Sequence, residues 1–204
     1  MIAIADYGMG NRRSVEKALE HVGARSVISA DHDVIRRAHA IILPGVGAFP
    51  EAMRNLDRSG LGEVLIERAQ AGVPLLGICL GMQLLFECST EHEGAEGLGI
   101  LPGRVTALES PRLPHIGWNL VTFEREAALT EGLGEAAAFY HVHSFACRPE
   151  EPADIVGTAE YGERFVSIVE RDNVMAAQFH PEKSSRDGLR LLRNFATRAA
   201  VAVA

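Results

Sequence analysis

Cysteines, tryptophan and long apolar runs are scarce in this 204-residue sequence. Three cysteines, an odd number without framework spacing, exclude a secreted disulfide scaffold and indicate a reducing compartment. The longest apolar stretches, such as residues 73–76 and 199–204, fall far short of the roughly 20 residues that span a bilayer. The N-terminus lacks the basic stretch, apolar core and cleavage site of a secretory signal. We therefore expect a cytoplasmic protein.

Positive charge is also in short supply. Lys and Arg number 20 against 27 Asp and Glu, which gives a formal net charge of −7. This field repels nucleic acid and anionic membrane surfaces, so we expect neither as a partner. The sequence contains no P-loop and no metal-ligand cluster, and we expect no cofactor and no metal. A hydrophobic content of 47% suits a single domain over residues 1–204.

The order of the apolar segments predicts an α/β fold. Short apolar runs alternate with helical patterns in the first third, which is typical of a parallel sheet with crossover helices. The run at 73–78 is the most apolar, so we expect it to be a central strand. Later strands follow one another closely, as in an antiparallel layer. We predict an open, mostly parallel twisted sheet flanked by helices, with an antiparallel extension.

The expected elements can be given by residue range. The strands are 2–5, 26–30, 40–43, 73–78, 104–108, 117–123, 137–143, 154–160, 165–171 and 174–179. The helices are 15–22, 33–39, 51–58, 63–71, 82–86 and 186–198. The acidic, glycine-containing segment 91–99 is expected to be a mobile loop.

The strongest local signal is Gly77-Ile78-Cys79-Leu80-Gly81, between the buried strand and the helix at 82–86. A nucleophile elbow has this construction, because small residues two places either side let the backbone pass closely. The helix start would favour a thiolate and supply the Leu80 N–H as an oxyanion donor. Most free cysteines are buried core residues, and we assign that role to Cys88 and Cys147, which lack the flanking glycines.

A thiolate nucleophile needs a general base and a group that orients it. Phe179-His180-Pro181-Glu182 offers both, because His180 and Glu182 would project to one side of an extended segment. Alone, this motif is more typical of a solvated loop histidine. A further oxyanion donor is expected in Pro44-Gly45-Val46-Gly47, at the carboxyl end of another strand, where open α/β sheets bind ligands. An ordinary βα turn is the alternative there.

The N-terminus offers a different function. Gly8 and Gly10 follow a strand, and Asp31 lies about 20 residues further on, as in a dinucleotide-binding site. However, Arg13 occupies the place of the third glycine, so we regard an oxidoreductase as the weaker hypothesis. A non-catalytic interaction module is a third possibility, and the presence of all three residue types of the triad argues against it.

Taken together, three motifs resemble those of class I (triad) glutamine amidotransferases. They are Gly-Ile-Cys-Leu-Gly-Met-Gln at 77–83, Pro-Gly-Val-Gly at 44–47 and Gln-Phe-His-Pro-Glu-Lys-Ser-Ser at 178–185. The segments 6–11, 114–119 and 143–144 narrow the resemblance to the glutaminase subunits of imidazole glycerol phosphate synthase. It extends over nearly the whole chain, with the motifs in the family's order.

The resemblance implies hydrolysis of L-glutamine to glutamate and ammonia. Cys79 would attack the amide carbon, His180 would transfer protons, and Glu182 would orient His180. The N–H groups of Gly47 and Leu80 would stabilise the tetrahedral intermediate. The glutamine-binding residues that carry over are Gln83, Glu91, His143 and Ser144. A solvated surface carboxylate is the alternative for Glu91.

A partner is also implied. In the family the ammonia passes to a (β/α)8-barrel cyclase subunit, with which the glutaminase forms a heterodimer. Residues that match partner-facing positions are Asn11, Arg12, Trp118, Tyr140 and Lys183. A single tryptophan is often a core residue, but the segment 114–119 looks too polar for deep burial, and interfaces favour Trp, Tyr and Arg.

The chain departs from the family at one strand. Where the family usually reads Tyr-Phe-Val-His-Ser-Tyr, residues 140–145 read Tyr-His-Val-His-Ser-Phe, which adds His141. Two histidines two residues apart suit a metal pair, but no third ligand stands at ligand spacing, so we expect no metal there. The role of His141 stays open.

Overall fold

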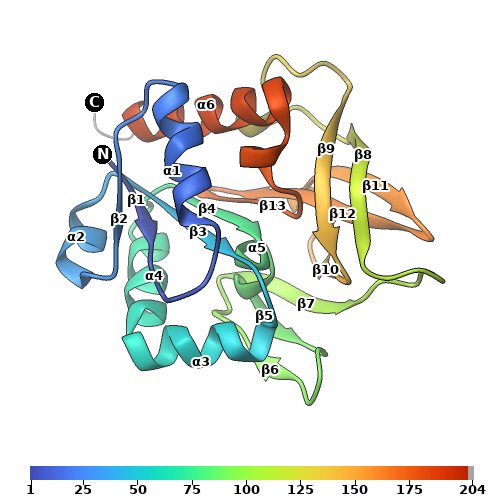
Figure 1. The fold of residues 1–204 in the computed structure, drawn as a ribbon, viewed down its shortest axis with the longest axis horizontal. Coiled ribbons are helices and arrows are strands. Elements are labelled where there is room, and N and C mark those ends of the chain that lie inside the picture. The colour runs from blue at the N-terminus through green and yellow to red at the C-terminus, as the bar shows by residue number, and fades with distance from the viewer. Residues whose placement is uncertain (202–204) are drawn as a thin grey trace.

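A nine-stranded mixed sheet runs through the molecule in the order β2-β1-β3-β4-β13-β12-β11-β8-β9 (Figure 1). The computed structural model describes residues 1–201. The strands of this sheet are β1 Ile2–Ala5, β2 Ser26–Ser29, β3 Ala40–Gly45, β4 Leu75–Cys79, β8 His115–Phe123, β9 Ala136–His143, β11 Ile155–Tyr161, β12 Glu163–Arg171 and β13 Val174–Ala177.

Strands β2, β1, β3, β4 and β13 are parallel to one another, and β12, β11, β8 and β9 continue the sheet in antiparallel pairs. The predicted parallel sheet with an antiparallel extension is therefore confirmed. Strand β4 lies between β3 and β13 and is buried along its whole length, as its apolar sequence predicted. One strand of the second half, β13, joins the parallel part instead of the antiparallel layer.

Within residues 1–201, six α-helices cover the two faces of this sheet. They are α1 Arg12–His21, α2 His32–Arg37, α3 Phe49–Ser59, α4 Leu61–Gln70, α5 Leu80–Leu84 and α6 Ser185–Val201. The predicted helix at 82–86 is displaced by two residues, because the observed helix begins directly after Cys79 and Phe86 already belongs to a strand. Figure 1 shows α1 and α6 together at the top and α3 at the bottom.

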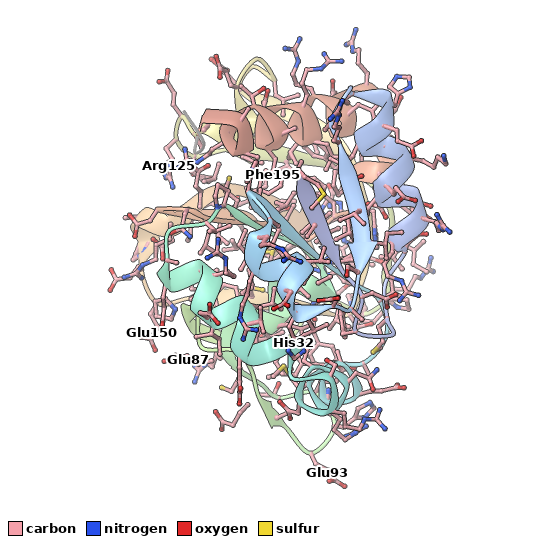
Figure 2. The ribbon with its side chains drawn as sticks, turned by 90° about the vertical axis from the view of Figure 1, so that its left-hand side faces the viewer. His32, Glu87, Glu93, Arg125, Glu150 and Phe195 are labelled. Atoms are coloured by element: carbon pink, nitrogen blue, oxygen red, sulfur yellow. The ribbon has the colours of Figure 1, made fainter. Side chains whose placement is uncertain are left out.

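Alternation along the strands assigns side chains to the two faces. In β1, Ile2 and Ile4 pack with α1 and α6, whereas Ala3 and Ala5 face the core of α2, α3 and α4. Phe195 of α6 is fully buried and points from the helix into the core that it shares with Ile2 and Ile4 (Figure 2). Each such buried side chain contributes about 1.5–3 kcal/mol relative to an exposed one.

A second, four-stranded sheet was not predicted. Its order is β10-β7-β5-β6, with β5 Phe86–Ser89, β6 Ala95–Glu96, β7 Leu101–Ala107 and β10 Phe145–Pro149. The expected strand 104–108 thus lies outside the main sheet. Strand β10 escaped prediction because one residue, Ser144, separates it from β9. The expected loop 91–99 contains β6, which pairs with β5, while Glu93 lies at its tip (Figure 2).

Three short turns complete the described backbone. Turns of 3-10 helix occur at Ala128–Thr130, Pro152–Asp154 and Pro181–Lys183. Within residues 1–201, no helix is both long enough and apolar enough to cross a membrane.

Candidate active site

Cys79 is the last residue of β4 and directly precedes α5. Its backbone has φ 56° and ψ −112°, a strained conformation for a residue with a side chain. The flanking glycines explain how the chain makes this turn. A Cβ on Gly81 would overlap the carbonyl of Leu43, and one on Gly77 would lie 2.8 Å from the Gly81 oxygen. The predicted strained strand-to-helix turn is therefore confirmed.

The Cys79 thiol faces a cavity of about 320 Å³. Its Sγ lies 3.6 Å from the carbonyl oxygen of Val142, and Gln178 Nε2 lies 3.9 Å from Sγ. The residue is 5% exposed, so a small substrate can reach it while bulk water is largely excluded. The other residues that line the cavity are Val46, Gly47, Leu80, Gln83, Glu91, Pro114, His143, Ser144, Phe145, His180 and Lys183.

His180 lies in the same cavity, and its Nδ1 is 3.0 Å from Oε1 of Glu182. Both side chains are almost fully buried, at 4% and 1% exposure. The pairing is reached through a 3-10 turn at Pro181–Lys183, not through the extended segment that we expected. The backbone N–H of His180 donates to the carbonyl of Tyr140 at 2.9 Å, which fixes the base to β9.

The charge state of His180 follows from its neighbours. Burial alone lowers the pKa of His180, but hydrogen bonds and charges from Cys79 and Glu182 outweigh it and raise that pKa to about 10. A pKa above neutrality keeps His180 in its imidazolium form at neutral pH. The site can therefore offer a nucleophile and an acid at the same time.

Both residues predicted to supply oxyanion donors line the cavity that the thiol faces. In the β3–β4 ladder Gly45 is the partner of Cys79, so the turn after β3 lies directly beside the elbow. Gly47, with φ +102°, and Leu80, the first residue of α5, both line the cavity. The Tyr7 hydroxyl donates to the carbonyl of Pro44 at 2.8 Å and holds the end of β3 in place.

Gln83, Glu91, His143 and Ser144, which the sequence marked as substrate residues, all line the cavity. Gln83 Nε2 donates to Phe145 O and Gln178 Oε1, both at 3.1 Å. The Glu91 side chain is 14% exposed and does not stand free in solvent. The structure thus brings together elements as distant as β3, α5, β9 and the segment after β13.

Known proteins are similar in sequence to this chain. The family model for class I glutamine amidotransferases matches residues 3–199. The chain belongs to this family. It is 50% identical over 198 residues to the imidazole glycerol phosphate synthase subunit HisH of Aquifex aeolicus (strain VF5), covering 96% of each chain. It is also 50% identical over 197 residues to HisH of Bacillus cereus (strain G9842), covering 96% of this chain and 93% of that one.

Solved structures support the fold assignment. A crystal structure of a glutamine amidotransferase has a TM-score of 0.78 at 20% identity, covering 98% of each chain. The structure of PurLQS from Thermotoga maritima has a TM-score of 0.72 at 19% identity, covering 97% of each chain. The α/β fold expected from the sequence is therefore that of the class I glutamine amidotransferases.

The residues that we expected at a partner interface lie on several different elements of the fold. Trp118 is 55% exposed, so the alternative of a core tryptophan is wrong, and its ring meets Tyr140 edge-on with centroids 6.3 Å apart. Asn11 precedes α1, and Arg12 forms an ion pair with Asp6. Lys183 is exposed and also lines the cavity.

Sequence reasoning missed several residues around the thiol. Val142 contributes a backbone carbonyl, for which no side-chain signal exists. Gln178 and Tyr7 stand within motifs already recognised, but their buried contacts with Cys79 and Pro44 depend on the tertiary fold. Ile116 and Leu120, at 59% and 58% exposure, extend the exposed apolar face around Trp118.

The alternative dinucleotide site is not supported by the geometry. Asp31, the residue expected to hold a ribose, caps α2 by accepting from the N–H groups of Asp33 and Val34. A Cβ on Gly10 would lie 3.1 Å from Pro44, so this glycine serves packing against β3. Membership of the amidotransferase family accounts for the N-terminal strand and turn instead.

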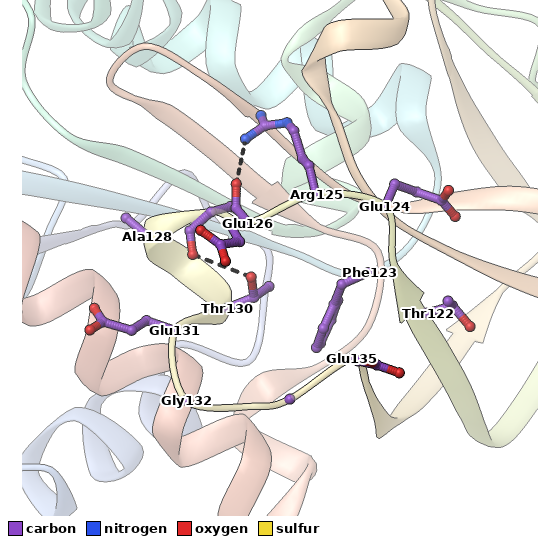
Figure 3. Close-up of a pocket in the computed structure, with 12 residues that line it drawn as sticks. Thr122, Phe123, Glu124, Arg125, Glu126, Ala128, Thr130, Glu131, Gly132 and Glu135 are labelled. Carbon is purple, nitrogen blue, oxygen red and sulfur yellow. Dashed lines mark hydrogen bonds between the residues drawn. The ribbon is translucent and has the colours of Figure 1, made fainter.

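A larger hollow, of about 1010 Å³, lies at the loop that joins β8 to β9 (Figure 3). Its rim carries Glu124, Glu126, Glu131 and Glu135. Arg125 is occupied there, because its guanidinium donates to the carbonyls of Glu126, Ala153 and Glu170. The hollow contains no residue of the predicted triad, and size therefore does not identify the active site.

Proposed function

We propose that this chain is the glutaminase subunit of an imidazole glycerol phosphate synthase, acting in histidine biosynthesis. The observation that carries the proposal is the placement of Cys79 and His180 in one cavity, with Glu182 bonded to His180, in a chain half identical to HisH subunits. In this role the chain hydrolyses L-glutamine to glutamate and ammonia, and the ammonia serves a second subunit.

The reaction proceeds through a covalent thioester. The Cys79 thiolate attacks the side-chain amide carbon of glutamine and forms a tetrahedral intermediate. His180 gives its proton to the leaving nitrogen, the C–N bond breaks, and ammonia departs. His180 then takes a proton from water, which attacks the thioester and releases glutamate and the thiolate. A pKa of about 10 keeps His180 protonated at neutral pH for the first transfer.

Glu182 holds His180 in the orientation that both transfers need. Its carboxylate accepts from Nδ1–H and leaves Nε2 for the thiol and the substrate. Backbone N–H groups of Leu80 and Gly47 stabilise the oxyanion of the tetrahedral intermediate. Because Gly47 has a positive φ and follows a strand end, its peptide is free to reorient when the substrate binds.

The glutamine itself is held at its far end. The Glu91 carboxylate receives the substrate ammonium, and Gln83, His143 and Ser144 form the walls around the carbon chain and carboxylate. With these assignments the amide of the substrate lies at Cys79.

We assign the partner as a cyclase subunit with a (β/α)8 barrel, in a heterodimer. Ile116, Trp118 and Leu120 alternate along β8, and their exposed side chains form an apolar surface on one face of the strand. Exposed apolar surface of this kind is typical of a protein interface. The carbonyls of Tyr140 and Val142, on the paired strand β9, contact His180 and Cys79. The partner therefore docks next to the strand that carries the site.

The test is Cys79→Ala in the assembled complex. The variant loses glutamine-dependent formation of imidazole glycerol phosphate and keeps formation driven by added ammonium salt. Loss of both activities together would make Cys79 structural. A partner other than the cyclase would redirect the ammonia and leave the glutaminase assignment intact, and co-purification from the source cell identifies it.

A further inference from the structure

Three buried histidines lie together on the paired strands β8 and β9. His115 of β8 is 3% exposed, and His141 and His143 of β9 are 0% and 6% exposed. The ring of His115 stacks on that of Tyr161 with centroids 4.0 Å apart. Phe165 packs against all three imidazoles. None of these rings transfers a proton in the proposed reaction, and of the three only His143 lines the cavity.

The hydrogen bonds of His143 fix its proton. Its Nδ1 lies 2.9 Å from the carbonyl oxygen of Phe145, which can only accept, so Nδ1 carries the hydrogen. A neutral imidazole has one N–H, and Nε2 of His143 is therefore an acceptor. The group 3.1 Å from that Nε2 is Nδ1 of His115, which must donate.

The same logic continues to the surface. Because His115 donates through Nδ1, its Nε2 accepts, and Asn119 Nδ2 lies 3.4 Å from it. Asn119 Nδ2 also donates to the carbonyl of Glu160 at 2.9 Å. A directed chain of donors thus runs from Asn119 through His115 and His143 to the Phe145 carbonyl. Burial is the main reason that the pKa of His143 is lowered, to about 3. Burial also lowers the pKa of His115, so both rings are neutral.

The end of this chain is a wall of the glutamine cavity. Phe145 O also accepts from Gln83, and residues 142–145 line the cavity beside Cys79. The start of the chain is on β8, whose opposite face carries Ile116, Trp118 and Leu120. One face of β8 therefore carries the exposed apolar side chains, and the opposite face carries His115, which leads to the cavity wall.

We propose that His115 is a positioning residue for the glutaminase reaction, which holds His143 and, through it, the backbone of residues 143–145 in the conformation that binds glutamine. This inference rests on the proposed function. It assigns no direct contact with substrate to His115. Asn119 serves the same end by fixing the His115 ring.

The first measurement is the tautomer of each histidine in the wild-type chain, by ¹⁵N NMR of histidine-labelled protein at neutral pH. The proposal requires hydrogen on Nδ1 of both His115 and His143, whereas free imidazole side chains prefer hydrogen on Nε2. A signal from His143 with hydrogen on Nε2 would overturn the chain, whatever the activity of any variant.

The second measurement compares two substitutions at one position, in the complex with the cyclase. His115→Phe keeps the ring and removes the donor, which leaves a buried acceptor unpaired and lowers kcat/KM for glutamine about 10-fold or more. His115→Asn restores a donor at the place of Nδ1 and recovers most of this loss. The ammonium-driven reaction is unchanged in both. Equal losses in the two variants would show a merely structural role.

His141→Phe is the matched control from the same cluster. His141 forms hydrogen bonds with Phe139 O and Ser167 Oγ and is not part of the hydrogen-bond chain. Its replacement therefore leaves kcat/KM for glutamine within about twofold. A loss as large as that of His115→Phe would contradict the proposal. If wild-type protein shows no Cys79-dependent glutamine hydrolysis, the proposed function fails. The tautomers of His115 and His143 still decide whether the hydrogen-bond chain exists.

Discussion

The Glu91 carboxylate accepts a hydrogen bond from the backbone N–H of Phe49, with Oε2 and N 2.8 Å apart. Phe49 is the first residue of α3 and follows Gly47 by two positions. One carboxylate therefore reaches both the proposed site of the substrate ammonium and the turn that carries an oxyanion donor. The anion also faces the N-terminal end of α3, where negative charge is favourable.

Glu91→Gln tests this double role. The amide oxygen can still accept from Phe49, so we expect little change in melting temperature, while loss of the charge raises KM for glutamine about 10-fold or more. Steady-state kinetics of the complex measure the change. Glu93→Gln is the control, because Glu93 is exposed at the tip of the same loop and should leave KM unchanged. An unaltered KM in Glu91→Gln would remove Glu91 from substrate binding.

Gly81→Ala should destabilise the fold, because the added Cβ overlaps the carbonyl of Leu43 and must push α5 away from β3. We expect a loss of about 2–4 kcal/mol in the free energy of unfolding, measured with urea. Gly72→Ala is the comparison. Gly72 has φ +79° with nothing within 4 Å of its Cβ position, so it incurs only a backbone cost of about 1 kcal/mol. Similar losses in both variants would contradict close packing as the cause.

Acid should weaken the fold through the three buried histidines. Burial lowers the pKa of His141 to about 2 and of His143 to about 3, and it also lowers the pKa of His115. Below pH 6.5 the unfolded chain binds protons at these positions and the folded chain does not, so stability falls as pH falls. His141 and His143 each contribute a loss of about 1 kcal/mol between pH 6.5 and 5.5, and His115 acts in the same direction.

Urea unfolding at pH 6.5 and pH 5.5 measures this loss, and His141→Phe should reduce it by about 1 kcal/mol. His180 has the opposite sign. Its raised pKa of about 10 adds stability that is fully present below pH 6.5 and is lost as pH rises toward 10. It therefore does not alter the slope on the acid side. Stability that is equal at the two pH values would show that the cluster is protonated in the folded chain.

Trp118→Ala should weaken binding of the cyclase without weakening the free chain. A central interface tryptophan is worth about 2 kcal/mol or more, which corresponds to about a 30-fold higher dissociation constant. Since Trp118 is 55% exposed in the free chain, its melting temperature should stay nearly constant. Arg36→Ala, on α2 next to the opposite edge strand β2, is the control. Equal affinity for Trp118→Ala and wild type would place the partner elsewhere.

The parallel half of the fold could be predicted because its signals are local. The apolar run before Cys79, the flanking glycines and the helical spacing after Gly10 each lie within a few residues of the element they specify. The place of β13 beside β4 depends on pairing between Val174 and Leu75, about 100 residues apart, for which the sequence carries no comparable signal. The second sheet was missed for the same reason.

The candidate site shows a similar division. Cys79, His180 and Glu182 were predictable because their chemistry resides in side chains and in short motifs. The carbonyls of Tyr140, Val142 and Phe145 were not, because a backbone oxygen has no residue type that marks it. His141 and His143 were noticed as a pair, but their link to His115 depends on the register of β8 and β9, in which His115 pairs with His143.

The central claim is that Cys79 is the nucleophile that attacks glutamine. It is tested most directly by treating the complex with 6-diazo-5-oxo-L-norleucine, an electrophile that mimics glutamine, and mapping the adduct by mass spectrometry. We predict a single adduct on Cys79, with Cys88 and Cys147 unlabelled, and slower labelling in the absence of the cyclase. Inactivation of glutamine hydrolysis with the adduct on another residue, and none on Cys79, would contradict the account.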